Sequence, residues 1–263
     1  MHPILFRFGP ITIFTYGFFL ALGFITAIFL AGREAQRLGL PAGRFYDLCF
    51  FIILAALVGS RLLYVITEYQ YFLAHPLEVF VLWKGGLIFH GGLILALAVA
   101  FYYMRRHGLP WRSTFDALAV GMPLGQSLGR VGCFMAGCCY GRPSNLPWAV
   151  TFTHPETLCP IKEPVHPSQL YEAVLLLFVF AVIYQSRTRK RFEGQLMLTY
   201  FFLAGSVRFF VEFFRHPLDY RGPLLFWEMP ATQVFALGIA LVGGCLLFWF
   251  WRKSQGDKPG KPN

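Results

Sequence analysis

Charged side chains are scarce in this sequence. Of its 263 residues, 14% are Asp, Glu, Lys or Arg, and 56% are hydrophobic. A soluble domain carries about a quarter charged residues. This balance argues against an ordinary water-soluble domain and predicts a chain that places most of its length in a lipid bilayer.

Other patterns are absent as well. We find no internal repeat and no second domain, so we expect one transmembrane domain over residues 1–254 and a short polar tail over 255–263. The first apolar stretch lacks a basic lead and a small-residue cleavage site, so it is expected to be a retained span rather than a cleaved signal peptide.

The cysteines do not follow a metal-binding spacing. They are Cys49, Cys133, Cys138, Cys139, Cys159 and Cys245. Zinc sites usually need paired C-x-x-C motifs or histidines at set distances along the chain. We therefore expect no metal site and no cofactor. A disulfide from Cys159 to Cys138 or Cys139 is plausible.

Seven stretches are long and apolar enough to cross a bilayer, which requires about 20 residues. Two of them, 11–32 and 231–251, carry no charge. The other five contain one or a few polar residues and cover 47–66, 86–104, 115–134, 170–185 and 195–214. The sequence predicts an all-α integral membrane protein with about seven transmembrane helices.

The basic residues predict the orientation of these helices. Of the 23 lysines and arginines, 14 lie in alternate connections and in the C-terminal tail, six lie in the opposite connections and three lie within spans. The positive-inside rule places the richer side in the cytoplasm, so the N-terminus is expected outside and the C-terminus inside. The outer loops are then about 67–85, which we interpret as an interfacial arm, and 137–169.

Because the basic residues follow topology, the net charge of +10 does not indicate a nucleic-acid partner.

Charged residues within the spans are the strongest functional signal. Arg61, Arg130 and Arg208 lie in apolar stretches, together with His90, Glu172 and Glu212. A charge at mid-bilayer is costly and usually faces a cavity or a partner. Arginine–glutamate pairs could simply hold helices together, but the number of such residues favours a polar site.

The spacing of Arg208, Glu212 and Arg215 places them on one face of a helix. Glu212 can pair with either arginine, which would leave the other guanidinium to hold an anion such as phosphate. Arg130 lies in the glycine-rich stretch 125–132, where small residues permit close approach of a ligand or close packing of helices. His90 is a candidate proton acceptor, although a single membrane histidine is more often structural.

Several segments, taken together and in order, resemble the bacterial phosphatidylglycerol–prolipoprotein diacylglyceryl transferases. The matching segments are Tyr16-Gly17, the Gly-Ser-Arg-Leu of 59–62, the Gly-Gly-Leu-Ile-Phe-His-Gly-Gly of 85–92, the stretch 129–142, the His-Pro-Ser-Gln-Leu-Tyr-Glu of 166–172 and the Arg-x-x-x-Glu-x-x-Arg of 208–215. The resemblance implies a bacterial inner-membrane enzyme that transfers a diacylglyceryl group from phosphatidylglycerol to the lipobox cysteine of a prolipoprotein signal peptide. The product is a thioether, and glycerol phosphate leaves. We expect this enzyme to act as a monomer in the bilayer.

The resemblance also implies roles for individual residues. The expected catalytic residues are His90, which would help to activate the thiol, together with Arg130, Arg208 and Tyr16. The expected substrate-binding residues are Arg130, Arg208, Arg61, Gly141, Glu212, Arg215 and Gln169. For Arg61, an architectural role or a secondary headgroup contact is the more plausible interpretation.

Three positions depart from the family pattern. The family usually has asparagine where this chain has Cys133 and Ala136, and glutamate where it has Cys138. These changes leave open a paralogue with a different acceptor. Two further alternatives are a lipid or anion transporter that uses the same arginines and a thiol–disulfide enzyme built on the cysteines.

Overall fold

The computed structural model describes residues 1–9, 11–81, 85–216, 224 and 229–256. The chain divides into two compact units. The first unit combines 1–34 with 115–263, and the second consists of 35–114. The single domain expected over 1–254 stays a prediction, and most of the expected tail, 257–263, lies outside the described residues.

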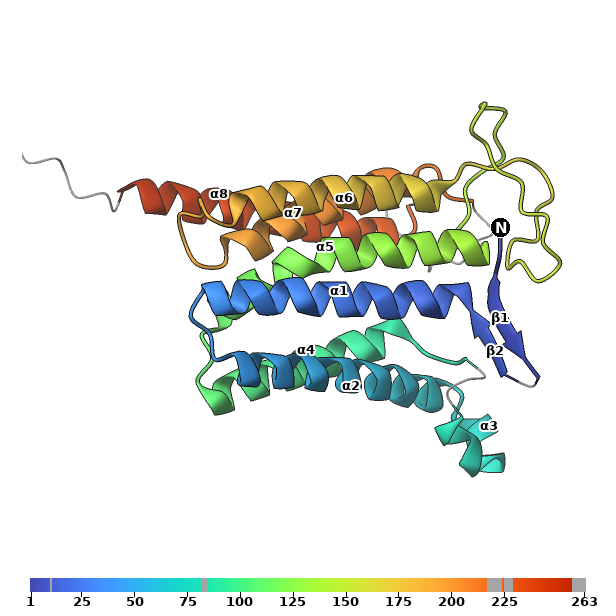
Figure 1. Cartoon of the computed structure of the whole chain (residues 1–263), viewed down its shortest axis with the longest axis horizontal. Coiled ribbons are helices and arrows are strands. Elements are labelled where there is room, and N and C mark those ends of the chain that lie inside the picture. Colours follow the sequence, from blue (N-terminus) through green and yellow to red (C-terminus); the bar gives the residue numbers. More distant parts are fainter. Residues whose placement is uncertain (10, 82–84, 217–223, 225–228, 257–263) are drawn as a thin grey trace, which may run out of the picture. The chain divides into compact units, whose positions relative to one another are not determined.

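The first unit begins with a two-stranded hairpin rather than a helix. Strands β1 (Ile4–Phe8) and β2 (Ile11–Phe14) are antiparallel, with Ile4 opposite Phe14 and Phe8 opposite Ile11 (Figure 1). Helix α1 (Thr15–Arg37) follows directly. The predicted span at 11–32 is therefore wrong at its start, because the β-branched and aromatic residues of 11–14 favour a strand as much as an apolar helix.

Small residues bring α1 against α5 (Trp111–Ala136) within this unit. A Cβ atom added to Gly23 would lie 2.7 Å from the carbonyl oxygen of Gly125, and one added to Gly121 would lie 2.1 Å from that of Ala27. Such close backbone approach is typical of helix packing in membranes. Helix α5 continues through Pro123 and ends at Ala136.

Helices α6 (Ser168–Ser186), α7 (Gln195–Glu212) and α8 (Ala231–Gly256) pack in sequence order, as Figure 1 shows. Ile183, Leu196 and Tyr200 belong to the core between α6 and α7. The buried carboxylate of Asp116 accepts hydrogen bonds from the backbone N–H groups of Gly194, Leu196 and Met197 and contacts Lys190 Nζ at 2.9 Å. Asp116 therefore caps the start of α7, although it comes from α5.

The second unit is built on α2 (Ala42–Thr67) and α4 (Phe89–His107). These helices are antiparallel, because Gly59 meets Gly91 while Arg44 donates to the carbonyl of His107. Between them lie α3 (Tyr69–Ala74) and the 3-10 helix η1 (Pro76–Phe80). Leu73, Leu77 and Phe80 of this connection are largely exposed. The placement of this connection as an interfacial arm stays a prediction, and its Trp83 and Lys84 lie outside the described residues.

The helices are those of an α-helical membrane protein. Four of them, α1, α2, α6 and α8, are long and apolar enough to cross a membrane by length and composition. Helices α4, α5 and α7 coincide with the other three predicted spans but carry charged or small polar residues that lower their mean hydropathy. The count of seven spans therefore stays a prediction. The structure is consistent with an all-α membrane protein, to which the described residues add the short β1–β2 hairpin.

Candidate active site

The first unit gathers two of the predicted arginines around one carboxylate. Arg130 near the end of α5 contacts Glu172 through Nε at 3.0 Å, and Arg208 of α7 contacts the other oxygen of Glu172 through Nη1 at 3.1 Å. Glu172 is 6% exposed. The carboxylate thus holds two guanidinium groups side by side, which is a suitable arrangement for binding a phosphate.

A second carboxylate extends the cluster. Glu212 contacts Arg208 Nη2 at 2.8 Å and Arg215 Nη1 at 3.5 Å, and it accepts a hydrogen bond from Thr232 at 3.1 Å. The expectation that Glu212 pairs with one arginine and leaves the other guanidinium without a carboxylate is wrong. Helix α7 also ends at Glu212, so Arg215 lies beyond the helix face on which the spacing placed it.

Gly141 fixes the chain beside Arg215. Its N–H donates to the carbonyl of His166 at 3.0 Å, and it forms an antiparallel bridge with Arg215. A Cβ atom at this position would lie 2.4 Å from the His166 oxygen and 2.8 Å from the Phe214 oxygen. Only glycine fits here without moving backbone, so Gly141 positions Arg215. Its predicted contact with substrate stays a prediction.

Tyr16 and Gln169 approach the same region. The Tyr16 backbone packs against Gly132 of α5, and the Tyr16 hydroxyl is close enough to Arg130 and to Cys133 to interact electrostatically with both. Gln169 is buried and donates from Nε2 to the carbonyl of Cys138 at 2.7 Å. In this structure Gln169 therefore holds the chain after α5, and its predicted role in substrate binding stays a prediction.

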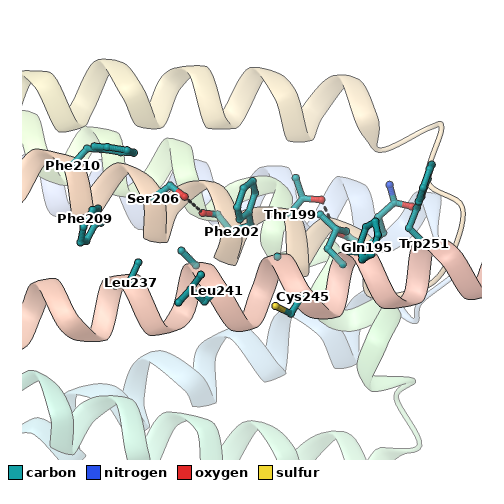
Figure 2. Close-up of a pocket in the computed structure, with 14 residues that line it drawn as sticks. Gln195, Thr199, Phe202, Ser206, Phe209, Phe210, Leu237, Leu241, Cys245 and Trp251 are labelled. Carbon is teal, nitrogen blue, oxygen red and sulfur yellow. Dashed lines mark hydrogen bonds between the residues drawn. The ribbon is translucent and has the colours of Figure 1, made fainter.

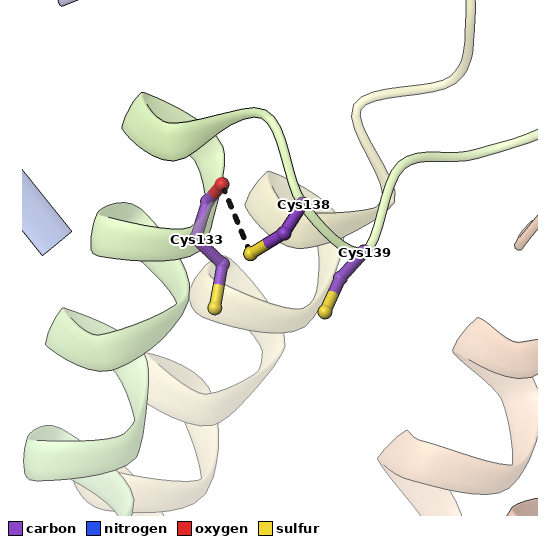
Figure 3. Close-up of side chains that lie close together, drawn as sticks. All are labelled: Cys133, Cys138 and Cys139. Carbon is purple, nitrogen blue, oxygen red and sulfur yellow. Dashed lines mark hydrogen bonds between the residues drawn. The ribbon is translucent and has the colours of Figure 1, made fainter. Parts of the chain in front are cut away.

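Three cysteines lie next to Arg130. The sulfur atoms of Cys133, Cys138 and Cys139 are all within 4.8 Å of one another (Figure 3). Arg130 Nη1 donates to the sulfur of Cys139 at 3.8 Å. Hydrogen bonds from the thiols of Cys133 and Cys138 lower the pKa of Cys139, and the charges of Arg215 and Arg130 add to this effect against the opposing effect of burial.

The expected disulfide of Cys159 is not formed, because all six cysteines are thiols. Cys159 instead packs in a small core with Tyr140, Phe152 and Val165, inside the loop between α5 and α6. The spacing of the other three cysteines does not match a zinc motif, and the chain reversal after α5 brings their sulfur atoms together.

His90 and Arg61 belong to the second unit. His90 lies in the first turn of α4 and is exposed. Arg61 is buried and donates from Nε to the carbonyl of Val79 at 2.9 Å and from Nη1 to that of Gly85 at 2.8 Å, and its guanidinium lies over the ring of Phe72. These contacts tie the connection after α2 to that helix. The catalytic role of His90 and the headgroup contact of Arg61 stay predictions.

Two apolar grooves accompany the polar cluster. One of about 710 Å³ runs between α7 and α8 past Phe202, Leu237 and Trp251 (Figure 2). Its polar side chains Thr199 and Ser206 donate to carbonyls of their own helix. The other, of about 590 Å³, is lined by Trp148, Leu170, Tyr171, Phe210, Phe214 and neighbouring apolar residues. Its residues Tyr171 and Val211 directly precede Glu172 and Glu212 along the chain.

Comparison with known proteins gives one consistent family. A family model described as prolipoprotein diacylglyceryl transferase matches residues 3–249. A phosphatidylglycerol–prolipoprotein diacylglyceryl transferase of Bordetella avium is 36% identical over 263 residues, which cover 98% of this chain and 97% of that protein. Proteins of the same name are 34% identical in Coxiella burnetii, covering 97% of both chains, and 35% identical in Geobacter sulfurreducens, covering 92% of this chain and 94% of that one. The chain therefore belongs to the prolipoprotein diacylglyceryl transferase family.

Proposed function

We propose that this protein transfers the diacylglyceryl group of phosphatidylglycerol to the lipobox cysteine of a prolipoprotein. Family membership over nearly the whole chain supports the reaction. The observation that carries the assignment of residues is the bridge that Glu172 makes between Arg130 and Arg208. A lipid phosphate needs several aligned N–H donors, and the bridged pair supplies them from two helices.

In the reaction, the acceptor sulfur attacks the glyceryl carbon that is bound to the phosphate oxygen. The carbon–sulfur bond forms as the carbon–oxygen bond breaks, and the electron pair of the broken bond stays on the departing glycerol phosphate. Negative charge therefore develops on the phosphate oxygen. Arg130 and Arg208 stabilise that charge from a largely buried position, where such contacts are stronger than in water.

The acceptor thiol must lose its proton, because the thiolate is the nucleophile. His90 serves as the base in this proposal, and Tyr16 helps to position the reacting groups near Arg130. Glu212 and Arg215 keep the orientation of Arg208. The groove lined by Trp148, Tyr171 and Phe214 takes an acyl chain of the lipid, since its lining consists mainly of aliphatic and aromatic side chains on α6 and α7, the helices that also carry Glu172 and Arg208.

The proposal includes a place for the enzyme in the cell. Seven helices cross the bacterial inner membrane, with the N-terminus outside and the active site toward the outer leaflet. Phosphatidylglycerol and the prolipoprotein signal peptide both reach the site within or from the bilayer, and the enzyme acts as a monomer without nucleic acid.

A reconstituted transfer assay tests the proposal. The full-length protein is placed in vesicles with phosphatidylglycerol and a lipobox peptide, and the peptide mass is followed. We expect the peptide to gain one diacylglyceryl group on its cysteine. Arg130→Ala and Arg208→Ala should abolish this gain, whereas Arg7→Ala, which removes an exposed ion pair with Glu156, should not. Lipid movement between leaflets without any peptide mass gain would instead identify a transporter.

A further inference from the structure

Three thiols converge where the chain leaves α5. Cys133 comes from the last turn of the helix, while Cys138 and Cys139 come from the segment that follows it. Gly137, at φ +79°, reverses the chain, and the N–H groups of Gly137 and Cys138 both donate to the carbonyl of Cys133. This helix-ending turn folds Cys138 back over Cys133, as Figure 3 shows. The three sulfurs therefore face one small volume.

Neighbouring groups hold this arrangement in place. Ser168 and Gln169, at the start of α6, donate to the carbonyls of Cys139 and Cys138 at 2.9 and 2.7 Å. Cys139 has a φ of +58°, a backbone conformation that is uncommon for a residue other than glycine. Such strain persists only where surrounding contacts enforce it, and it concentrates at functional sites. The thiols are thus positioned by the fold and do not depend on a disulfide.

Charge identifies the class of ligand. The adjoining cluster contains three arginines, Arg130, Arg208 and Arg215, and two carboxylates, Glu172 and Glu212, so it carries one net positive charge. Three thiolates with one divalent cation carry one net negative charge and would neutralise it. A monovalent soft cation such as Cu⁺ would leave two negative charges. Among soft cations that thiolates select, Zn²⁺ gives the better match.

We propose that Cys133, Cys138 and Cys139 form a three-thiolate site for a zinc-class divalent cation beside Arg130. Tetrahedral zinc with sulfur ligands at about 2.3 Å places the sulfurs about 3.8 Å apart. The observed sulfurs, all within 4.8 Å of one another, need to approach by about 1 Å at most. Each thiol releases its proton to solvent as it binds the cation.

The site has an open coordination position. Among the described residues, the group of potential ligands consists of these three cysteines. Zinc with three protein ligands commonly takes water or substrate as its fourth ligand. An exogenous thiol fits that position, because zinc binds sulfur as a thiolate. This second step rests on the proposed function, in which the acceptor is a cysteine thiol.

Cobalt binding tests the site without any transfer reaction. Co²⁺ is added to the reduced, metal-stripped full-length protein in detergent, and absorption by the sulfur-to-cobalt charge-transfer bands is recorded. We expect saturation at one Co²⁺ per chain and displacement by Zn²⁺. Cys133→Ser, Cys138→Ser and Cys139→Ser should each weaken binding at least 100-fold. Cys245→Ser is the matched control, because Cys245 is an exposed thiol on α8, and it should bind as the unmodified protein does.

Two measurements can overturn the proposed three-thiolate site. The proposed site would be overturned if the unmodified protein gave no charge-transfer bands. It would also be overturned if the bands persisted in Cys133→Ser, Cys138→Ser and Cys139→Ser alike. A measurement on the unmodified protein avoids variants that fail to fold: Zn²⁺ should protect Cys133, Cys138 and Cys139 from alkylation, as read by peptide mass, and should leave Cys245 reactive. Equal alkylation with and without Zn²⁺ would also overturn it.

The open position has its own test. A lipobox peptide added to the Co²⁺-loaded protein, without phosphatidylglycerol, should shift the cobalt bands, whereas the same peptide with serine in place of cysteine should not. Identical spectra with both peptides would reject the open position while leaving the three-thiolate site standing. Because lipid transfer is not measured, failure here is distinct from failure of the proposed function.

Discussion

At the scale of single residues, Glu172 is the centre of the site. It contacts Arg130 with one carboxylate oxygen and Arg208 with the other. Because the side chain is nearly buried, water cannot take the place of its negative charge when the residue is substituted. Glu172 is the side chain that both arginines contact, while Arg208 also contacts Glu212 and Arg130 also donates to Cys139. Glu172 therefore links the two guanidinium groups across the helices.

We expect Glu172→Gln to lower the rate of diacylglyceryl transfer at least 100-fold, which corresponds to about 3 kcal/mol of transition-state stabilisation. An amide offers one acceptor oxygen and no charge, so one arginine loses its contact and the excess positive charge of the cluster rises. The measurement is the initial rate with lipobox peptide in phosphatidylglycerol vesicles. Glu163→Gln, an exposed position in the loop before α6, is the control and should keep the rate. A near-normal rate for Glu172→Gln would refute this role.

Sequence reasoning found the arginines but not the bridge. A charged residue within an apolar stretch can be recognised from the sequence alone, so Arg130, Arg208 and Glu212 were predicted as site residues. Glu172 was noted within a span, yet its pairing with arginines 42 and 36 positions away depends on how α5, α6 and α7 meet. The sequence also draws attention to Cys133, Cys138 and Cys139, but their spacing matches no metal motif, and their sulfurs come together only through the turn at Gly137.

At the scale of elements, the start of α7 depends on a residue from α5. Asp116 accepts hydrogen bonds from three backbone N–H groups at that start and pairs with Lys190. The carboxylate is fully buried. It complements the positive end of the helix dipole and satisfies donors that have no partner within the helix.

Asp116→Asn should therefore destabilise the protein by about 3 kcal/mol, the usual cost of breaking a buried ion pair by changing one partner. We expect a lower midpoint of thermal unfolding in detergent, with faster hydrogen exchange at Gly194, Leu196 and Met197. The control is Asp47→Asn, because Asp47 is exposed and its one described contact, with the Tyr103 hydroxyl, is long at 3.5 Å. Unchanged exchange at these amides would contradict the capping role.

The bridge between Gly141 and Arg215 gives a second prediction for elements. In Gly141→Ala the new Cβ would meet two backbone oxygens, which cannot move as the tip of a side chain can. We expect a loss of about 1–3 kcal/mol in unfolding free energy and a reduced transfer rate, because Arg215 shifts. Gly238→Ala, with open space at the Cβ position in α8, should be neutral or stabilising by up to about 1 kcal/mol. Equal stability of the two variants would exclude the clash.

The helices were predicted correctly where the hydrophobicity of a segment is enough to determine its structure. The charge-free runs gave most of α1 and α8, and the polar-interrupted runs gave α2, α4, α5, α6 and α7 within a few residues at most ends. Hydrophobicity predicted the wrong element at residues 11–14, because it does not separate a strand from a helix. Pairing with residues 4–8 decides that segment, and such pairing is not visible in the local sequence.

At the scale of the whole molecule, the distribution of charge carries a prediction about orientation. The basic residues gather in alternate connections, 14 against six, and the tail after α8 belongs to the richer side. Moving such residues across the bilayer during insertion is unfavourable, so we expect them to stay in the cytoplasm. The loop between α5 and α6, which contacts the arginine cluster through the bridge between Gly141 and Arg215, is then expected to face outward.

Thiol labelling tests this orientation. A membrane-impermeant maleimide should label Asn145→Cys in intact spheroplasts, whereas Gln255→Cys should be labelled only after the membrane is permeabilised. Both positions are exposed, so access to the reagent depends on the side of the membrane, and the unmodified protein gives the background of the native thiols. The reverse pattern would place the arginine cluster on the cytoplasmic side. A lipobox cysteine is presented near the outer end of its signal peptide, so that pattern would also separate the cluster from its proposed acceptor.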